Sequence, residues 1–279
     1  FTGSTSIKMR RRRENDNTKS VALGGDFNVA GGTLSVSGSY ARAEKRDPLR
    51  SEFTFNGPSA VVNYDLTTKP YSFIPVGSPF DTASAFSFNK VNFDNRLAVE
   101  KLWQGRVDYT LPISIGDDSS IKVGGKYLDR HKTNDENDLT YKKGSTKWAM
   151  TNVAYVGNTN FYDGMFHFGD RIDWDAAKDY VDANPGVVKI DNATSIANSL
   201  AGDYDVHEQI AAGYAMATLK FGGLTLIPGI RVEHTRDKTK AKIVDENSTI
   251  DEAYNSFGSK SYTNWFPGLN ARYDVGNGI

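Results

Sequence analysis

The chain has 279 residues, of which 38% are hydrophobic and 24% are charged, with a formal net charge of -1 at pH 7. Because the 33 basic and 34 acidic residues nearly cancel, no global field attracts nucleic acid, which is excluded as a partner. Cysteine is absent, which excludes thiol catalysis, cysteine-based zinc sites and disulfide bonds. No apolar run approaches the roughly 18 residues of a membrane helix, so a helical membrane protein is excluded, whereas spanning β-strands pass this test.

Alternation of apolar and polar residues predicts about eight strands. In chain order they are expected over residues 4–11, 18–29, 33–44, 95–112, 119–131, 204–221, 224–236 and 260–275. The pattern is clearest in the seventh strand, where Leu224, Leu226 and Val232 share one face and polar residues dominate the other. Only Gly222 and Gly223 with their neighbours separate the sixth strand from the seventh, which predicts a tight hairpin.

Short and long connections alternate along the chain. Short turns are expected near residues 31, 116, 222 and 277, and longer connections at about 12–17, 45–94, 132–203 and 237–259. Bacterial outer-membrane barrels are connected in this way, with periplasmic turns and long extracellular loops. The sequence therefore predicts an all-β chain that forms a portion of an antiparallel transmembrane β-barrel. The alternative is a soluble β-sandwich, but such a fold gains nothing from connections that are long at one end only.

Seven aromatic residues lie on the apolar face of the predicted strands. They are Phe27, Tyr40, Trp103, Tyr109, Tyr127, Trp265 and Tyr273. Their distances from the short turns form two bands that bracket the roughly 9 to 11 residues of a tilted span, so we expect them at the lipid interfaces. In the sixth strand Tyr214 is expected on this apolar face, and Phe221, which has the opposite parity, does not fit the pattern.

The opposite face of the strands is polar and rich in small residues. Its charged members are expected to point into the lumen of the barrel: Arg106, Asp108, Lys126, Arg130, Arg231, Glu233 and Arg272. A small closed barrel fills its interior with its own side chains. The Gly, Ala and Ser residues on this face therefore favour a lumen that is filled by other protein.

The connection 132–203 is too long for a structureless loop and is expected to be functional or partly folded. Asp173 is predicted to cap a short helix that ends at Asn184, Pro185 and Gly186. Five aromatic residues precede or begin this helix: Phe161, Tyr162, Phe166, Phe168 and Trp174. Two interpretations stay open, because these side chains can bind a ligand by stacking or can form the small core of the loop.

Other groups with chemical potential give weaker signals. Three carboxylates resemble calcium ligands: Asp170, Asp173 and Asp175. Their spacing matches no full calcium loop and lacks the closing glutamate, so neither a metal site nor a cofactor is expected. His131 with Asp129, and His207 with Asp205, share a strand face near the rim, where an outer-membrane protease places Asp-His pairs. Coincidence is the preferred interpretation of both pairs, and no catalytic residue is expected.

A run of four arginines, Arg10 to Arg13, lies at the far end of the first predicted strand. Such a run suggests nucleic acid or lipid. We interpret it as solvated, in contact with acidic lipopolysaccharide groups, or paired with the neighbouring Glu14 and Asp16.

Two segments near the end of the chain resemble a known family. E-Q-I-A-A-G-Y at 208–214, followed by G-I-R-V-E-H-T at 229–235, is similar to a strand pair of the TonB-dependent outer-membrane receptors. W-F-P-G-L-N-A-R-Y-D at 265–274 is similar to the P-x-L-N-x-R-Y strand of the same family.

The resemblance implies a 22-stranded barrel with an N-terminal plug in its lumen and with energy supplied through TonB. Residues 1–279 are then expected to be a partial barrel domain without the plug, its TonB-contact segment or the C-terminal strands. Because the chain opens at Phe1 without a signal segment, we expect it to be part of a longer protein. The implied partners are outer-membrane lipid, lipopolysaccharide, the plug and TonB, and the implied location is the bacterial outer membrane. Arg231 and Glu233 are implied to be structural groups that face the plug.

The implied function is gated active import of a ligand too large or too scarce for porins, such as a ferric siderophore or an oligosaccharide. One alternative is a passive porin or a small structural barrel, and another is an outer-membrane enzyme that uses a rim Asp-His pair. An N-terminal extension the size of a domain would separate the transporter from the porin. The sequence does not identify the substrate, because loop chemistry determines it.

Overall fold

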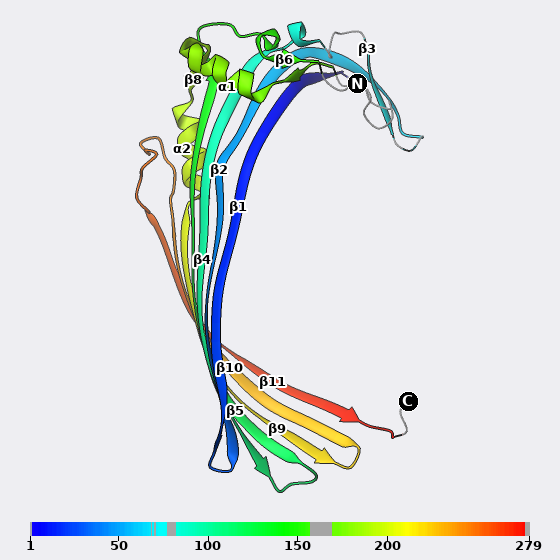
Figure 1. Ribbon diagram of the computed structural model, residues 1–279, viewed down its shortest axis with the longest axis vertical. Coiled ribbons are helices and arrows are strands. Elements are labelled where there is room, and N and C mark those ends of the chain that lie inside the picture. The colour runs from blue at the N-terminus through cyan, green and yellow to red at the C-terminus, as the bar shows by residue number, and fades with distance from the viewer. Residues whose placement is uncertain (1, 68, 70, 77–81, 157–168, 277–279) are drawn as a thin grey trace.

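A single curved antiparallel sheet makes up most of the molecule, as the computed structural model in Figure 1 shows. The structure describes residues 2–67, 69, 71–76, 82–156 and 169–276. The long strands are β1 (Thr2–Val29), β2 (Gly32–Asp65), β4 (Ser87–Ile113), β5 (Ser119–Lys143), β9 (Tyr204–Phe221), β10 (Leu224–Ala241) and β11 (Ser256–Tyr273). They pair in the order β1-β2-β4-β5-β9-β10-β11, and the sheet is open between β1 and β11. The predicted all-β, antiparallel barrel architecture is confirmed.

The two ends of the sheet differ, because the short turns lie at one end and the helices and longer connections at the other (Figure 1). We call these the turn end and the loop end. The turn between β1 and β2 consists of Ala30 and Gly31, whose φ angles are 47° and 79°. Positive φ at both central residues matches the twist of a two-residue hairpin, and glycine adopts it without strain. The short turn predicted near residue 31 is therefore confirmed.

Small elements decorate the loop end. They are β3 (Ser72–Val76), β6 (Ala154–Tyr155), β7 (Arg171–Ile172), β8 (Val188–Ile190), the helices α1 (Trp174–Ala183) and α2 (Asn192–Gly202), and the 3-10 turns η1 (Ala83–Ala85), η2 (Met150–Asn152) and η3 (Pro185–Val187). Asp173 caps α1 as predicted, because its side chain accepts a hydrogen bond of 3.0 Å from the backbone N–H of Ala176. Within the described part of the chain, no helix has the length and apolar character needed to cross a membrane.

The first two predicted strands are one strand. The connection expected at about 12–17 is wrong, because β1 pairs with β2 through this segment, from Arg12 opposite Arg50 to Asn17 opposite Glu44. A register shift between Arg13 and Asn15 is the only irregularity there. Acidic residues of β2 pair with two arginines of the run Arg10 to Arg13, which holds the run within the sheet.

The two longest connections are shorter than expected. Strand β2 continues to Asp65 and β4 begins at Ser87, so only residues 66–86 connect them instead of about 45–94. Strand β5 likewise continues to Lys143, so the connection predicted from 132 begins at 144. Both strands pass through polar, charged stretches, at 44–50 and 132–138, in which the alternation of apolar and polar residues is interrupted. This alternation is the signal from which the strands are predicted.

The hydrophobic core lies at the loop end. Phe53 and Phe55 of β2 and Val91 of β4 are fully buried beneath the connection that follows β5. Trp148 from that connection stacks on Phe88 at 4.6 Å between ring centroids. The connection therefore folds back onto the sheet and covers its apolar side chains with its own.

Helix α2 covers a free edge of β5. Strand β9 pairs with β5 only as far as Asn134, and β8 pairs with it from Tyr141 onward. Between them, Asp203, Ser199 and Ser195 accept hydrogen bonds of 2.7, 2.8 and 2.9 Å from the backbone N–H groups of three alternate residues of β5: Glu136, Asp138 and Thr140. Four residues of helix rise about 6 Å and two residues of strand about 6.6 Å, so the spacings match.

Candidate functional site

One face of the sheet is apolar and uncovered over the half nearer the turn end. Trp103 and Trp265 on this face are 59% and 66% exposed. Further large apolar side chains are exposed beside them: Val21, Leu23, Phe27, Val36, Val107, Ile121, Val123, Tyr127, Phe221, Ile230, Leu269 and Tyr273. Soluble monomers rarely expose an apolar surface of this extent, which instead marks contact with a membrane or a partner. We call this surface the apolar face and its opposite the polar face.

The seven aromatic residues predicted at the lipid interfaces all fall on the apolar face. Phe27 lies opposite Leu34, which in turn lies opposite Tyr109. Tyr40 lies directly opposite Trp103, with 4.4 Å between their ring centroids. The same parity holds for Tyr127, Trp265 and Tyr273. Their contact with lipid stays a prediction, but their arrangement on one surface is what that prediction requires.

The structure corrects the face assigned to β9. Phe221 lies opposite Leu224 and therefore belongs to the apolar face, whereas Tyr214 lies opposite Gly124 and belongs to the polar face. The Tyr214 hydroxyl donates a 2.6 Å hydrogen bond to Asp108. On the apolar face β9 presents Ala211, Gly213, Ala215 and Ala217, so side-chain size misled the prediction.

Asp108 is the centre of a buried polar group on the polar face. Only 5% of the residue is exposed, and its carboxylate lies 2.7 Å from Arg106 Nε and 3.7 Å from Lys122 Nζ. Gly124 makes the Tyr214 contact feasible, because a Cβ at this position would lie 2.2 Å from the Asp108 carboxylate and 2.6 Å from the Tyr214 ring. The strands are therefore tied together here by charge-assisted hydrogen bonds.

All seven residues predicted to face the lumen, including Asp108, lie on the polar face. Arg130 lies 3.5 Å from Glu100 and 3.2 Å from Glu208, and Arg231 Nε lies 2.5 Å from Glu233. Lys126 lies opposite Arg106, and Arg272 opposite Thr225. That this face lines a lumen stays a prediction.

A groove of about 550 Å³ crosses the polar face from β4 to β11. It is lined mainly by Arg106, Lys122, Lys126, Tyr214, Met216, Ile227, Arg231, Phe266 and Asn270. Its basic and amide side chains suit acidic or polar groups, whether these belong to a ligand or to another part of the protein.

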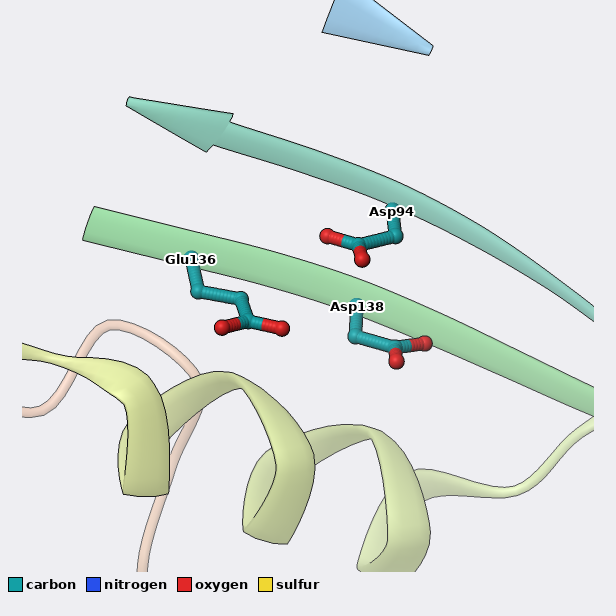
Figure 2. Close-up of side chains that lie close together, drawn as sticks. All are labelled: Asp94, Glu136 and Asp138. Atoms are coloured by element: carbon teal, nitrogen blue, oxygen red, sulfur yellow. The ribbon is translucent and has the colours of Figure 1, made fainter. Parts of the chain in front are cut away.

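Farther toward the loop end, the polar face carries a cluster of carboxylates that sequence reasoning missed. Asp94 of β4 and Glu136 and Asp138 of β5 bring their side chains together, as Figure 2 shows, with oxygens within 4.8 Å of one another. The only signal in the sequence is the alternate spacing of Glu136 and Asp138, because Asp94 comes from a different strand. Carboxylate oxygens are the ligands that calcium prefers.

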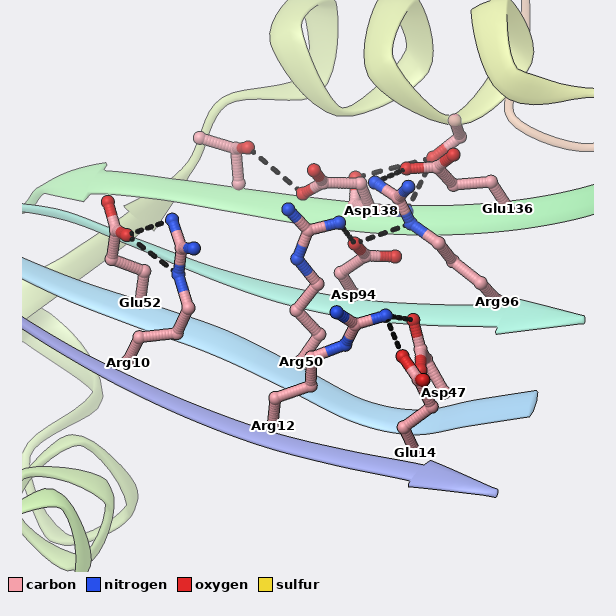
Figure 3. Close-up of polar contacts among 12 residues, drawn as sticks. Arg10, Arg12, Glu14, Asp47, Arg50, Glu52, Asp94, Arg96, Glu136 and Asp138 are labelled. Carbon is pink, nitrogen blue, oxygen red and sulfur yellow. Dashed lines mark hydrogen bonds and ion pairs between the residues drawn. The ribbon is translucent and has the colours of Figure 1, made fainter. Parts of the chain in front are cut away.

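Arginines already bind this cluster (Figure 3). Arg96 Nε lies 2.9 Å and Arg50 Nη1 lies 3.6 Å from Asp94 Oδ2, and Arg96 also pairs with Glu136. Burial raises the pKa of Glu136 to about 7, against the attraction of Arg96. Three carboxylates against two guanidiniums leave one excess negative charge, which a proton on Glu136 neutralises.

Three arginines of the run are paired with acidic residues of the protein itself. Arg10 Nη2 lies 2.7 Å from Glu52, and Arg12 Nη2 lies 2.8 Å from Asp47 and also pairs with Glu14, as Figure 3 shows. Arg11, on the opposite face of β1, pairs with Asp175 and lies 4.4 Å from the centroid of the Trp174 ring. The expected pairing with Glu14 is therefore confirmed, and the run fixes β1 to β2 and to α1.

Among the predicted loop aromatics, Trp174 is structural. Its indole N–H donates a 2.6 Å hydrogen bond to Ser51 Oγ, and its ring packs edge-on against Phe53 at 6.4 Å. The other four, Phe161, Tyr162, Phe166 and Phe168, lie outside the described residues.

Neither the acidic triplet nor the histidines form the groups that the sequence suggested. Asp170 accepts a 2.8 Å hydrogen bond from the Ala83 backbone, so it is not gathered with Asp173, the helix cap, or with Asp175. The Asp-His pairs exchange partners across strands: His131 lies 3.1 Å from Asp205, and His207 lies 2.9 Å from Asp129. Each histidine therefore pairs with its diagonal neighbour on the adjacent strand and not with the aspartate of its own strand.

Comparison with known proteins agrees with this geometry. The model of the family described as TonB dependent receptor-like, beta-barrel matches residues 37–279. A search among curated proteins finds no match. The matching region contains most of β2 and all of β4, β5, β9, β10 and β11. The chain belongs to the TonB-dependent receptor-like β-barrel family, a family of outer-membrane transporters of Gram-negative bacteria rather than of enzymes.

Proposed function

We propose that the protein imports a large ligand across the bacterial outer membrane with energy from TonB. The observation that carries this proposal is the two-sided sheet, which joins an uncovered apolar face to a charged polar face with a groove about 550 Å³ in volume. An apolar face of this kind suits lipid, and a charged opposite face suits a lumen that is filled by a plug. Family membership supports the coupling to TonB.

The ligand class is proposed as a ferric siderophore, an oligosaccharide or a similar molecule too large for a porin. Arg50 and Arg96 on the polar face near the loop end are candidates for ligand contact, because their side chains are 30% and 34% exposed. A ligand that enters from the loop end meets them before it reaches the groove. Trp174 is not proposed as a contact, since it packs into the core.

Uptake in cells tests the function. Cells that produce the protein from its complete coding sequence, and cells without it, are supplied with labelled ferric siderophores and labelled oligosaccharides. We expect one class to accumulate only in cells that have the protein, and accumulation to stop when TonB is deleted or a protonophore is added. Accumulation that persists without TonB contradicts active transport and supports the alternative, a passive porin.

A further inference from the structure

A row of basic residues crosses the apolar face just beyond its aromatic side chains. Each member lies directly opposite the next on the neighbouring strand: Lys19, Arg42, Lys101, His131, His207 and Lys238. Arg42 comes two residues after Tyr40, and Lys101 comes two residues before Trp103, so the row follows the aromatic residues on the side of the loop end. We call it the basic row.

The basic row carries surplus positive charge. Glu44 lies 2.5 Å from Arg42, Asp205 lies 3.1 Å from His131, and Asp129 lies 2.9 Å from His207. Across the described part of the chain, Lys19, Lys101 and Lys238 form no ion pair. Like charges directly opposite one another destabilise a sheet, so this row costs folding free energy unless an anion neutralises it.

The middle of the row is concave. Arg42, Val99, Lys101, His131 and Thr133 line a pocket of about 190 Å³. These side chains come from β2, β4 and β5 and all lie on the apolar face. A guanidinium offers a fork of donors, an ammonium offers a point charge, and the imidazole and hydroxyl add further polar groups. Phosphate is the anion that such a set recognises best.

The height of the pocket matches the headgroup layer of a membrane. Aromatic side chains such as Tyr40 and Trp103 mark the boundary between hydrocarbon and headgroups. Two residues of a strand tilted by about 45° rise roughly 5 Å along the membrane normal. Arg42 and Lys101 therefore lie where the phosphates of an acidic lipid lie, and the apolar belt below them suits the acyl chains of that lipid.

We propose that the pocket formed by Arg42, Lys101 and His131 binds a phosphate of lipopolysaccharide, the phosphorylated glycolipid of the outer leaflet. The inference rests on the proposed function in one respect, namely that the apolar face meets the membrane. It places lipid recognition at the basic row and not at Arg10 to Arg13, where Arg10, Arg11 and Arg12 are paired with acids of the protein.

Binding to purified lipopolysaccharide tests the proposal. The protein, produced from its complete coding sequence and purified in detergent, is titrated with lipopolysaccharide that carries its lipid phosphates and with the enzymatically dephosphorylated form. The double variant Arg42→Gln/Lys101→Gln removes two charge-assisted contacts, so we expect it to bind about tenfold more weakly or worse. The wild type is expected to lose a similar factor with the dephosphorylated lipid.

Matched variants separate binding from folding. Lys132→Gln removes a lysine from the polar face of β5 and should leave the affinity unchanged, and Lys101→Arg should retain it because the charge stays. Heat-modifiable migration on gels reports whether each variant has folded. Unchanged affinity in a folded double variant, or equal affinity of the wild type for both lipids, overturns the proposal. Competition by millimolar inorganic phosphate that is as strong as that by the lipid shows a free-anion site and also overturns it.

The proposal and the proposed function fail in different ways. If labelled ligands do not accumulate but lipopolysaccharide binding depends on Arg42 and Lys101, the transport proposal fails and the lipid site stands. If uptake depends on TonB while the double variant binds lipopolysaccharide as tightly as the wild type, the lipid site fails alone.

Discussion

The two halves of the same strands have different surroundings. Toward the turn end, Val107 and Trp103 on the apolar face are uncovered. On the polar face of the same half, basic side chains form ion pairs with Asp108. Toward the loop end, Phe53 has the parity of the apolar face but is completely buried under the connection after β5. The same face is therefore covered by the chain itself toward the loop end and is uncovered toward the turn end.

The largest expected effect is that of Phe53→Ala. The side chain packs edge-on against Phe93, Trp148 and Trp174, so its loss leaves a cavity that should cost about 3–5 kcal/mol. Hydrogen exchange should show faster opening of β2 and β4 near the loop end. Phe27→Ala, on the uncovered part of the apolar face, is the matched control and should leave that exchange unchanged. Equal effects of the two substitutions on hydrogen exchange would contradict the idea that only the half nearer the loop end is packed under its own chain.

Val107→Arg places a charge in the middle of the apolar face. If lipid covers this face, the variant should lose about 2–4 kcal/mol of stability in vesicles, as measured by urea titration. Gln104→Arg changes the polar face of the same strand and should cost far less. A Val107→Arg protein that is as stable as the wild type would argue against lipid contact.

Asp108→Ala tests how the polar face is held together. Without the carboxylate, Arg106 and the Tyr214 hydroxyl lose their acceptor, which should cost about 1–3 kcal/mol. Tyr214→Phe removes a single hydrogen bond and should cost about 1 kcal/mol. A double-mutant cycle by urea titration should give a coupling energy, and additive effects would show that the contact contributes nothing.

The smallest expected effect is a pH dependence at the loop end. The pKa of Glu136 is about 7 in the fold, above its ordinary value of 4.5. Between these values the folded protein binds more protons than the unfolded chain, so this group makes stability fall as pH rises, and the fall ends above about 7. Glu136→Gln should flatten that slope in melting curves recorded at several pH values. An unchanged slope would assign the dependence to other groups.

In the half of the sheet nearer the turn end, the sequence predicts well which face each residue lies on. Strict alternation in β10 gives its faces directly, and the parity of Trp103 and Tyr127 follows from the same rule. The predicted faces of strand β9 are wrong, because the alanine and glycine residues on the face away from Tyr214 are neither clearly polar nor clearly apolar. The size of Tyr214 suggested the apolar face, whereas its hydroxyl reaches Asp108 through the space at Gly124.

The side-chain contacts in the half nearer the loop end could not be predicted in the same way, because the residues that pair there lie on different strands. Nothing in the sequence near Arg12 points to Asp47, and nothing near Asp94 points to Glu136. Register determines both contacts: β1 and β2 pair with an irregularity between Arg13 and Asn15, whereas β4 pairs with β5 without one. Register also determines which aspartate each of His131 and His207 contacts on the neighbouring strand.

Helix α2 also bears on how the protein behaves among its neighbours. A strand edge that projects beyond a membrane offers unpaired backbone groups to any similar edge on an adjacent molecule. Ser195, Ser199 and Asp203 occupy those groups on β5, so molecules crowded side by side find no backbone to share at this point. Copies of this protein can then lie close together without pairing through that edge.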